Sequence, residues 1–567
     1  MARSYISSEK ENRPAWTRWF IPSIADLIFI ALLGVLTCTN LAVRLLGDAG
    51  IGWHIRTGQL ILFTHAIPHV DPFSSSMAGQ PWFAWEWLYD ALVGGLASAA
   101  GLNAVVVFTA FVIALTFSWT FRLLLRRSTN LFVALGLVLL AASASMIHFL
   151  SRPHVVSWLL TITWFWVLFS TGEKQLPSVQ VPRRTRSLWL LPPLMVLWVN
   201  IHGGFLLGFA LLGIYFLSAV WAWLQPSGDR FEDVLEKIVQ AKRIRSLALV
   251  GILSTLATFV NPYGWRLHVH VYRYLSNRFL MDHIDEFQSP NFHGAAQKCF
   301  AILLLLTLVA LAMKKRGTGG VETSEVHAVE VHAGEVHISD ALIVLFAVYS
   351  GLYASRNIPV SALLLILVIG PSLSNAFQTL FERFKKPPIA SRSQSASPNF
   401  LSRMQAIDSS LRGHLWPIAV IALTCWIAFH GGKLGSKLLM DAHFDSRRFP
   451  IGAVDYFQTH NLPQSIFAPD SWGGYLIYRL YPPTKVVVDD RHDFYGELFL
   501  KSYLKTMHVE PGWQDFLHDQ NVRCIVVPKD SALAGILLET PQWRPIYTDD
   551  VAIAFILPLP TMQTPSH

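Results

Sequence analysis

The chain has 567 residues, of which 52% are hydrophobic, 13% aromatic and only 14% charged. This composition is too apolar for an ordinary soluble protein and indicates a protein with several membrane spans. The formal net charge of +8 comes from short basic clusters between apolar runs, where topology signals occur, and this argues against nucleic-acid binding. The four cysteines have neither metal-ligand nor redox spacing, which argues against a disulfide framework or a zinc site.

Apolar runs recur along most of the chain. About 20 residues are needed to cross the hydrocarbon core as a helix. Eleven runs approach this length: 22–45, 103–121, 130–149, 155–170, 188–203, 204–224, 246–262, 297–313, 340–355, 358–377 and 414–431. The first run is long and lacks a small-residue cleavage motif, so we expect a retained span rather than a signal peptide. The sequence therefore predicts an α-helical polytopic membrane protein with about eleven transmembrane helices.

The loops between these runs differ in charge. With residues 1–20 in the cytoplasm, the loops on that side carry 25 Lys and Arg, against 8 in the opposite loops before residue 432. Because cytoplasmic loops are enriched in basic residues, this asymmetry supports a cytoplasmic N-terminus. We expect a transmembrane domain at 21–432 with a long first outer loop at 46–102, and an extracytoplasmic α/β domain at 440–567. The expected location is a bacterial plasma (inner) membrane.

Two longer cytoplasmic loops, 315–338 and 378–412, are expected to be linkers. The first contains a five-residue repeat, Glu325-Val-His327 to Glu335-Val-His337. Its His and Glu residues could bind a metal, but a period of five keeps no consistent helix face, so a low-complexity linker is the preferred interpretation. The second is rich in Ser and Pro, a composition typical of linkers.

The expected outer loops carry chemistry of a different kind. The first span is followed by Gly47-Asp-Ala-Gly-Ile-Gly-Trp-His-Ile-Arg56, and later loops contain Ser151-Arg-Pro-His154, Asn200-Ile-His202 and Ser355-Arg-Asn-Ile-Pro359. A carboxylate beside a span end is costly to desolvate and usually has a function. Polar groups near the membrane surface must be lined by protein or water. The sequence therefore predicts a polar cavity that opens to the outer side.

The pattern after residue 440 is that of a small α/β domain. Short β-like runs at Ser465–Ala468, Lys485–Val488, Val522–Val527 and Val551–Ile556 are separated by helix-length stretches such as Gly496–Met507 and Trp513–Asp519. The loop Asp489-Asp-Arg-His-Asp493 follows a strand, where α/β domains often bind ligands. For these aspartates, a solvated turn is the simpler interpretation and the one we expect.

A cytoplasmic N-terminus, a first span that ends at an acid, a long first outer loop and an outer C-terminal domain together resemble the GT-C superfamily of polytopic glycosyltransferases. This superfamily includes protein mannosyltransferases, aminoarabinose transferases and oligosaccharyltransferase subunits. The pattern Gly-Asp-x-x-x-x-Trp-His at 47–54 resembles in particular its bacterial members. The resemblance covers roughly residues 20–270. It implies transfer of a sugar from a polyprenyl-phosphate carrier to a glycan, lipid or protein acceptor at the outer membrane face.

Roles for individual residues follow from this resemblance. Asp48 is the expected catalytic base, since a partly desolvated carboxylate can take a proton from an acceptor hydroxyl. Fixed cations and donors stabilise a departing phosphate, and the expected ones are Arg56, Arg152, Arg356, His54, His154 and His202. Contacts to the sugar are expected from Trp53, Glu86, Trp85, Trp87 and Asn200.

Metal dependence is not expected, although the resemblance raises it. Several branches of the superfamily have two adjacent acids in the first loop that can bind a divalent metal. Here Ala49 and Gly50 follow Asp48, so a metal site would require Asp71, Glu86 or Asp285 to complete it in three dimensions.

Each of these roles has a structural alternative. Asp48 can cap the following helix, tryptophans near span ends can anchor in the membrane interface, and arginines there can extend to lipid headgroups. The function has alternatives too, namely a polytopic transporter or a non-catalytic partner in polysaccharide assembly or export. Transporters tend to have repeated halves and polar groups at the bilayer midplane, whereas here the polar motifs gather at one face.

Overall fold

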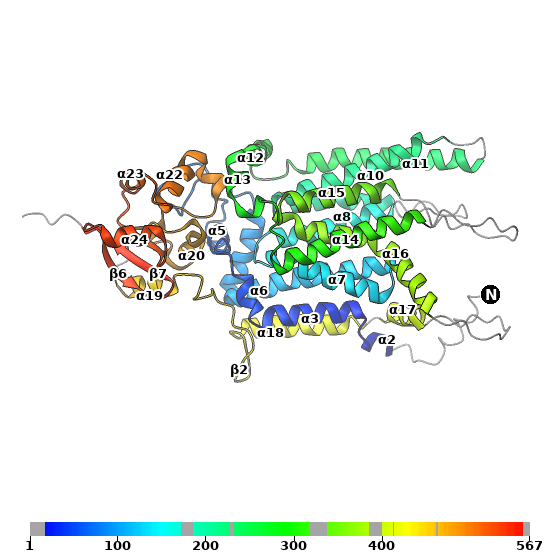
Figure 1. Ribbon diagram of the computed structural model, residues 1–567, viewed down its shortest axis with the longest axis horizontal. Helices are drawn as coiled ribbons and strands as arrows, with labels where there is room; N and C mark the ends of the chain where they lie inside the picture. The colour runs from blue at the N-terminus through cyan, green and yellow to red at the C-terminus, as the bar shows by residue number, and fades with distance from the viewer. Residues whose placement is uncertain are drawn as a thin grey trace, which may run out of the picture.

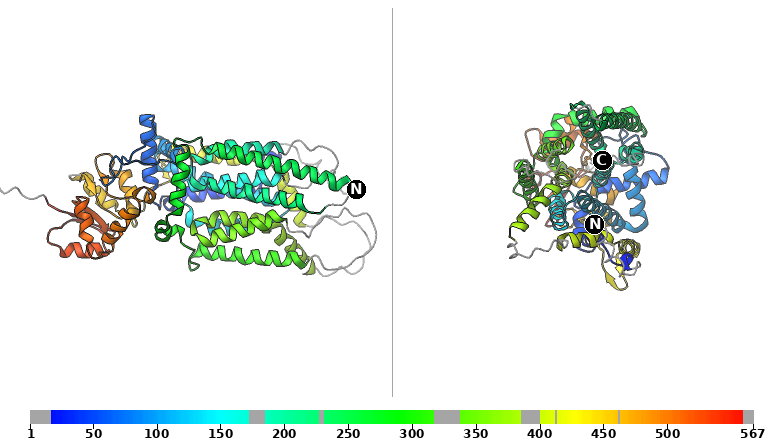
Figure 2. Two further views of the ribbon diagram at one scale, coloured as in Figure 1. Left: turned by 90° about the horizontal axis from the view of Figure 1, so that it is seen from above. Right: turned by 90° about the vertical axis from the view of Figure 1, so that its right-hand side faces the viewer.

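The computed structural model describes residues 17–171, 185–226, 231–316, 337–384, 400–411, 413–460 and 463–558. An elongated bundle of roughly parallel and antiparallel helices carries a smaller α/β region at one end, as Figure 1 and the two views of Figure 2 show. We call residues 440–558 of this α/β region the C-terminal domain. Helices α2 (Thr17–Phe20) and α17 (Phe400–Ser410) lie at the opposite end of the bundle.

Each of the eleven apolar runs overlaps a helix. The helices are α3 (Ile24–Cys38), α6 (Trp87–Arg126), α7 (Leu131–Ser145), α8 (His154–Ser170), α9 (Leu191–Val199), α10 (Leu206–Leu224), α11 (Phe231–Ala257), α14 (Ala295–Arg316), α15 (Ile338–Tyr353), α16 (Ile358–Phe384) and α18 (Leu415–Phe429). By length and composition, five helical segments in the described part of the chain are long and apolar enough to cross a membrane. These five coincide with most or all of α6, α7, α10, α14 and α16. The predicted polytopic helical fold class is therefore confirmed.

Two helices are longer than the apolar runs that predicted them. α6 begins at Trp87 because two helices join at a kink, where Ala100 and Gly101 have non-helical backbone angles and Gly101 has a φ of 66°. Only the part after the kink corresponds to the run at 103–121. α11 begins at Phe231, inside an expected loop, because this stretch is rich in Leu, Glu, Lys and Arg, which favour helix.

The two expected linkers lie largely outside the described residues. Residues 317–336, with most of the Glu-Val-His repeat, are not described, and neither are residues 385–399. The described ends of the second segment are helical, since α16 continues to Phe384 and α17 starts at Phe400.

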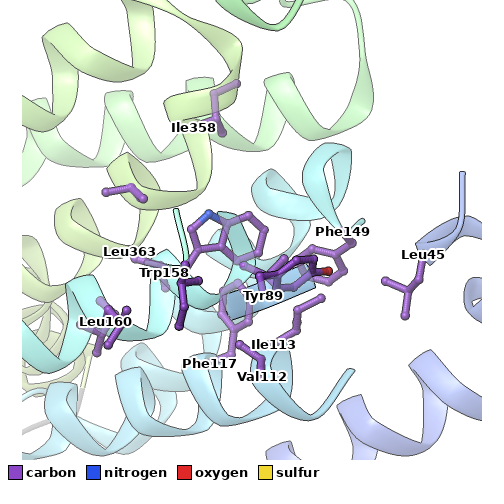
Figure 3. Packing of buried hydrophobic residues seen from close by; sticks show 14 of the residues in the cluster. Leu45, Tyr89, Val112, Ile113, Phe117, Phe149, Trp158, Leu160, Ile358 and Leu363 are labelled. Atoms are coloured by element: carbon purple, nitrogen blue, oxygen red, sulfur yellow. The ribbon is translucent and has the colours of Figure 1, made fainter. Parts of the chain in front are cut away.

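The bundle has an aromatic core near the end that carries the C-terminal domain. Figure 3 shows Phe117, Phe149 and Trp158 from three different segments packed together. The ring centroids of Phe117 and Phe149 are 5.9 Å apart, and those of Phe149 and Trp158 are 6.1 Å apart. Burial of large apolar side chains contributes about 1.5–3 kcal/mol each. This core holds the loop between α7 and α8, which carries Arg152, in a defined position.

The C-terminal domain has the strands that its sequence predicts. Strands β3 (Ser465–Ile466) and β4 (Lys485–Val486) pair in parallel, and β5 (Cys524–Pro528), β7 (Ala552–Ile556) and β6 (Arg544–Thr548) form an antiparallel sheet in that order. The strand β6 was not expected. The domain also contains helices α19 (Ile451–Thr459), α20 (Asp470–Leu480), α21 (His492–Tyr495), α22 (Glu497–Met507), α23 (Trp513–Asp519) and α24 (Ala532–Glu539). A hairpin of β1 (Lys433–Leu434) and β2 (Lys437–Leu438) lies between α18 and the domain.

The segment 46–102 joins the C-terminal domain to the bundle. The N–H of Ser75 donates to the carbonyl of Val486 at 2.8 Å, so this segment extends the sheet beyond β4. Helix α5 (Ile51–Thr64) crosses α20 closely, and a Cβ at Gly52 would lie 2.1 Å from the carbonyl oxygen of Gly474. Helices α4 (Leu41–Leu45), α12 (Trp265–Ser276) and α13 (Arg278–His283) lie at the same end of the bundle. Bundle and domain therefore form one continuous structure.

Candidate functional site

Asp48 and Arg152 meet where two of the expected outer loops come together. Nη2 of Arg152 lies 2.7 Å from Oδ1 of Asp48, which also accepts the N–H of Gly50 at 2.8 Å. The loop that carries Arg152 is fixed to the end of α4, because the N–H of Ser151 donates to the carbonyl of Leu45 at 2.7 Å. Residues 104 positions apart in the sequence are thus brought together at the end of the bundle.

A second carboxylate reaches the same arginine from the C-terminal domain. Asp490 pairs through Oδ2 with Nη2 of Arg152, and its Oδ1 accepts the indole N–H of Trp53 at 2.9 Å. A Cβ at Gly50 would lie 2.4 Å from both Arg152 Cζ and Asp490 Oδ2, so only glycine allows this approach. We call Asp48, Trp53, Arg152 and Asp490 the carboxylate–arginine cluster.

The two carboxylates of this cluster have different electrostatic environments. Burial opposes ionisation of Asp48, but the charge and hydrogen bond of Arg152 outweigh it and hold the pKa of Asp48 below its usual range. For Asp490, burial and the neighbouring Asp48 outweigh Arg152 and raise the pKa to about 6. One arginine therefore stabilises Asp48 as an anion, while Asp490 takes up a proton just below neutral pH.

A chain of polar side chains runs beside this cluster. Nδ1 of His54 lies 2.5 Å from Oδ1 of Asp90, and the carboxylate of Glu86 lies 3.9 Å from Nε2 of both His54 and His202. Nδ1 of His202 accepts the N–H of Gly204 at 3.0 Å, which places the proton of a neutral His202 on Nε2, facing Glu86.

Burial keeps these groups uncharged. It lowers the pKa of His54 and of His202 well below the usual range, and it raises the pKa of Glu86 to about 8. At neutral pH the three side chains therefore offer neutral hydrogen-bonding groups. Nε2 of His54 is fully buried and has no hydrogen-bond partner in the described structure.

Arg356 and His154 also face this region. Nη1 of Arg356 lies 3.4 Å from Oε1 of Glu286, and its guanidinium lies over the ring of Phe287 at 4.5 Å from the centroid. Arg152 and Arg356 both act electrostatically on Glu86 and on His202. His154 acts in the same way on Asp48, and its Nε2 lies 2.8 Å from the carbonyl oxygen of His148. Of the three residues expected to converge on Asp48, Arg152 contacts it directly. Arg356 and His202 are close enough to act electrostatically on one another, and their convergence on Asp48 stays a prediction.

Four other candidates make contacts within the protein, and their expected roles in ligand binding stay predictions. The guanidinium of Arg56 donates to the carbonyl of Tyr478 at 2.9 Å. The indole N–H of Trp87 donates to Oδ1 of Asn200 at 2.7 Å. Nδ2 of Asn200 donates to two backbone carbonyls at 2.7 and 2.8 Å. Trp85 packs against Gly203, where an added Cβ would lie 2.6 Å from its ring. These contacts link segments of the chain that are far apart in the sequence.

The loop 489–493 is not the solvated turn that was expected. Asp489 is fully buried and accepts from Nε and Nη2 of Arg491, while Nη1 of Arg491 lies 2.8 Å from Oδ1 of Asp71. The same guanidinium lies over the ring of Trp82 at 4.6 Å from the centroid. The sequence signal was an arginine among three acids directly after a buried strand, and its partner could not be read from the sequence.

The carboxylate–arginine cluster does not fit a divalent metal. The guanidinium of Arg152 occupies the place between Asp48 and Asp490 that a cation would need. Asp71, which could have completed a site, is bound to Arg491 and to Ser74. Within the described ranges, no group of three His, Cys, Asp or Glu side chains is arranged to hold a metal ion.

No family model and no curated protein matches the sequence. Solved structures do match. An oligosaccharyltransferase from Archaeoglobus fulgidus, tethered with an acceptor peptide, is 12% identical over 94% of this chain and 73% of that chain, with a TM-score of 0.50. ArnT from Cupriavidus metallidurans bound to undecaprenyl phosphate is 13% identical over 96% and 98%, with a TM-score of 0.47.

At 12% sequence identity, the match to the oligosaccharyltransferase shows that the two proteins share a fold, but not that they share an activity or a substrate. The common fold extends through the bundle and into the C-terminal domain, since the alignment covers 94% of this chain. The chain therefore shares the fold of the Archaeoglobus fulgidus oligosaccharyltransferase, and oligosaccharyltransferase subunits are among the proteins that the sequence resemblance named.

Proposed function

We propose that the protein is an integral membrane glycosyltransferase that transfers a sugar from a polyprenyl-phosphate carrier to an acceptor. The observation that supports this most directly is the contact between Asp48 and Arg152 at the junction of bundle and C-terminal domain. It provides an anionic base and a phosphate-binding cation side by side. The oligosaccharyltransferase-like fold supports the same reaction class, and ArnT, a looser match, binds undecaprenyl phosphate.

The proposed reaction is a single displacement at the anomeric carbon. An acceptor hydroxyl attacks this carbon while Asp48 takes the hydroxyl proton. The bond between the anomeric carbon and the phosphate oxygen breaks, and the bonding electrons leave with the polyprenyl phosphate. Such a displacement inverts the anomeric centre. Negative charge grows on the phosphate as the bond breaks, so a fixed cation beside it lowers the barrier.

Arg152 connects donor binding to the strength of the base. Without donor, the ion pair with Arg152 holds the pKa of Asp48 low despite its burial, so Asp48 is a weak base. A donor phosphate accepts two parallel hydrogen bonds from a guanidinium and competes with the carboxylates for it. When Arg152 turns to the phosphate, Asp48 loses its counter-charge, its pKa rises and it becomes a stronger base. Arg356, His154 and His202 provide further positive charge or donors.

Glu86 and Trp53 are placed to hold the sugar. The protonated carboxyl of Glu86, with its pKa raised to about 8 by burial, can donate to a sugar hydroxyl at neutral pH. His54 Nε2 offers a second buried polar atom without a partner in the described structure. The Trp53 ring stacks on His54 with the ring centroids 3.6 Å apart, and we expect its other face to pack on the apolar face of a sugar.

The location and orientation are part of the proposal. The difference of 25 against 8 basic residues between the two sets of loops supports a cytoplasmic N-terminus and an extracytoplasmic C-terminal domain. The site then faces the outer side of a bacterial inner membrane, in contact with membrane lipids. Reporter fusions at the C-terminus that are active only outside the cytoplasm test this orientation.

The direct test measures sugar transfer by the full-length purified protein in lipid nanodiscs, with a panel of polyprenyl-phosphate sugars. Asp48→Asn keeps the shape of the side chain but removes the base, and we expect a rate lower by about 10²–10⁴-fold. Arg356→Ala is expected to weaken use of the donor. Asp282→Asn, which changes an exposed ion pair with Arg278, is the matched control. Equal rates in all four proteins would refute the assigned roles, and a transporter or an assembly partner would transfer no sugar.

A further inference from the structure

Asp490 is a residue of the C-terminal domain that contacts the candidate site. It follows β4 and the buried residues Val487 and Val488, and its side chain is only 12% exposed. Both carboxylate oxygens are engaged, one by the indole N–H of Trp53 and the other by Arg152. An acid held in this way is positioned by two different parts of the chain, which points to a role beyond a surface ion pair.

The charges around Arg152 do not balance when both acids are ionised. One guanidinium then faces two carboxylates, those of Asp48 and Asp490, in a largely buried setting. A lipid phosphate that approaches Arg152 meets net negative charge and must displace a carboxylate. Of the two, Asp490 is the one whose negative charge is costly, since burial and Asp48 raise its pKa to about 6.

We propose that Asp490 is a positioning residue that competes with the lipid phosphate for the guanidinium of Arg152. The C-terminal domain thereby sets how tightly the site holds the polyprenyl phosphate. This inference rests on the proposed function, because it assumes a lipid-phosphate ligand. It adds a residue that comes from outside the helical bundle, 338 positions from its partner in the sequence.

The competition has a use in the reaction cycle. The donor is a phosphodiester with one negative charge, whereas the released polyprenyl phosphate is a monoester that carries up to two. An uncompensated Arg152 would hold the product more tightly than the donor, because attraction grows with charge. The carboxylate of Asp490 opposes this by offering Arg152 another partner, and so favours release of the spent carrier.

Several charged groups face Asp490, and the test must separate them. Arg152 and Asp48 approach from the bundle, and Asp489 and His492 act on Asp490 from its own loop. The pKa of His492 is itself raised, since hydrogen bonding and charge from Asp470 outweigh its burial. His492 therefore also gains charge as the pH falls.

The first experiment measures binding of polyprenyl phosphate without sugar to the full-length protein in nanodiscs at pH 8, where Asp490 is ionised. Asp490→Asn is expected to bind about tenfold more tightly, the effect of removing one neighbouring charge. Asp493→Asn is the matched control: this acid lies on the same loop but pairs with His270 at 2.9 Å, and its affinity is expected to equal that of the wild type.

The outcomes separate this inference from the function on which it rests. Tighter binding by Asp490→Asn alone supports both. Equal or weaker binding by this variant overturns the role of Asp490 and leaves the proposed function standing. If neither the wild type nor any variant binds the lipid, the proposed function fails and the inference fails with it.

A second measurement follows lipid binding by the wild-type protein as the pH changes, so it does not depend on whether an Asp490 variant folds. The probe is the monomethyl ester of the same lipid phosphate, whose single negative charge does not change across the pH range used. Wild-type affinity is expected to rise as the pH falls through about 6, because Asp490 takes up a proton and releases Arg152. The rise should persist in His492→Gln. A constant affinity, or a rise that disappears in His492→Gln, overturns the inference.

Discussion

Replacing Arg491 by Met tests the contact that holds the C-terminal domain to segment 46–102. Arg491 pairs with Asp71 and Asp489, and both carboxylates have 0% exposed side chains. Removing the guanidinium leaves two buried negative charges without a counter-charge. Breaking a buried ion pair in this way costs about 3–5 kcal/mol. A free-energy difference of about 1.4 kcal/mol corresponds to a factor of ten. The form in which the C-terminal domain has come away from segment 46–102 should therefore become roughly 10² to 10³·⁵ times more populated.

Hydrogen–deuterium exchange of the full-length protein measures this population. The N–H of Ser75 donates to the carbonyl of Val486, and the N–H of Val486 donates to the carbonyl of Phe73, so these amides report on the junction. In Arg491→Met their protection should fall by about two orders of magnitude or more, because exchange follows local opening. Arg447→Met, which breaks an exposed pair with Asp445, is the control. Unchanged protection at the junction would show that Arg491 does not hold the two segments together.

Three further results are expected. Gly50→Ala should lower kcat/KM by at least about tenfold, because its Cβ would lie 2.4 Å from Arg152 Cζ and Asp490 Oδ2; Gly34→Ala, with no atom within 4 Å, should leave transfer unchanged. Glu86 has a pKa raised by burial from 4.5 to about 8, so its contribution to stability is full below 4.5 and is lost as the pH rises to 8. The thermal unfolding midpoint should therefore fall less between pH 4.5 and pH 8 in Glu86→Gln than in the wild type. An identical pH profile in the two proteins would contradict the raised pKa of Glu86. Transfer should survive a chelator, since a guanidinium already bridges the two carboxylates; activity that returns only with added Mn²⁺ or Mg²⁺ would refute this.

Much of the fold could be predicted because hydropathy is a local property of the sequence. A helix crosses a bilayer only if about 20 successive residues are apolar, so each span leaves a visible run. The strands at 465, 485, 524 and 552 were found for a similar reason, since short apolar β-branched runs between turns are typical of buried strands. The part of α6 before the kink at Gly101 was not predicted as helix, because it precedes the apolar run at 103–121 and falls in the expected outer loop 46–102.

The candidate site could be predicted only in part. Asp48, Arg152, His202 and Arg356 stand out because charged or polar residues beside apolar runs are costly and therefore conspicuous. Trp87 and Asn200 stand out for the same reason, yet they bind each other at 2.7 Å. A sequence shows that a polar group lies near the membrane, but not whether its partner is a ligand or another side chain.

The sequence by itself determined that this chain is a polytopic membrane protein, where its apolar bundle helices lie and which acid follows the first of them. Only the tertiary structure decided that Asp490 shares Arg152 with Asp48, and that Arg491 binds Asp71 across 420 positions. The physical reason is that an ion pair depends on the distance between two groups in space, and nothing in the local pattern around either group encodes that distance. The loop 489–493 has the composition of a solvated turn, and it is buried because segment 46–102 folds over it.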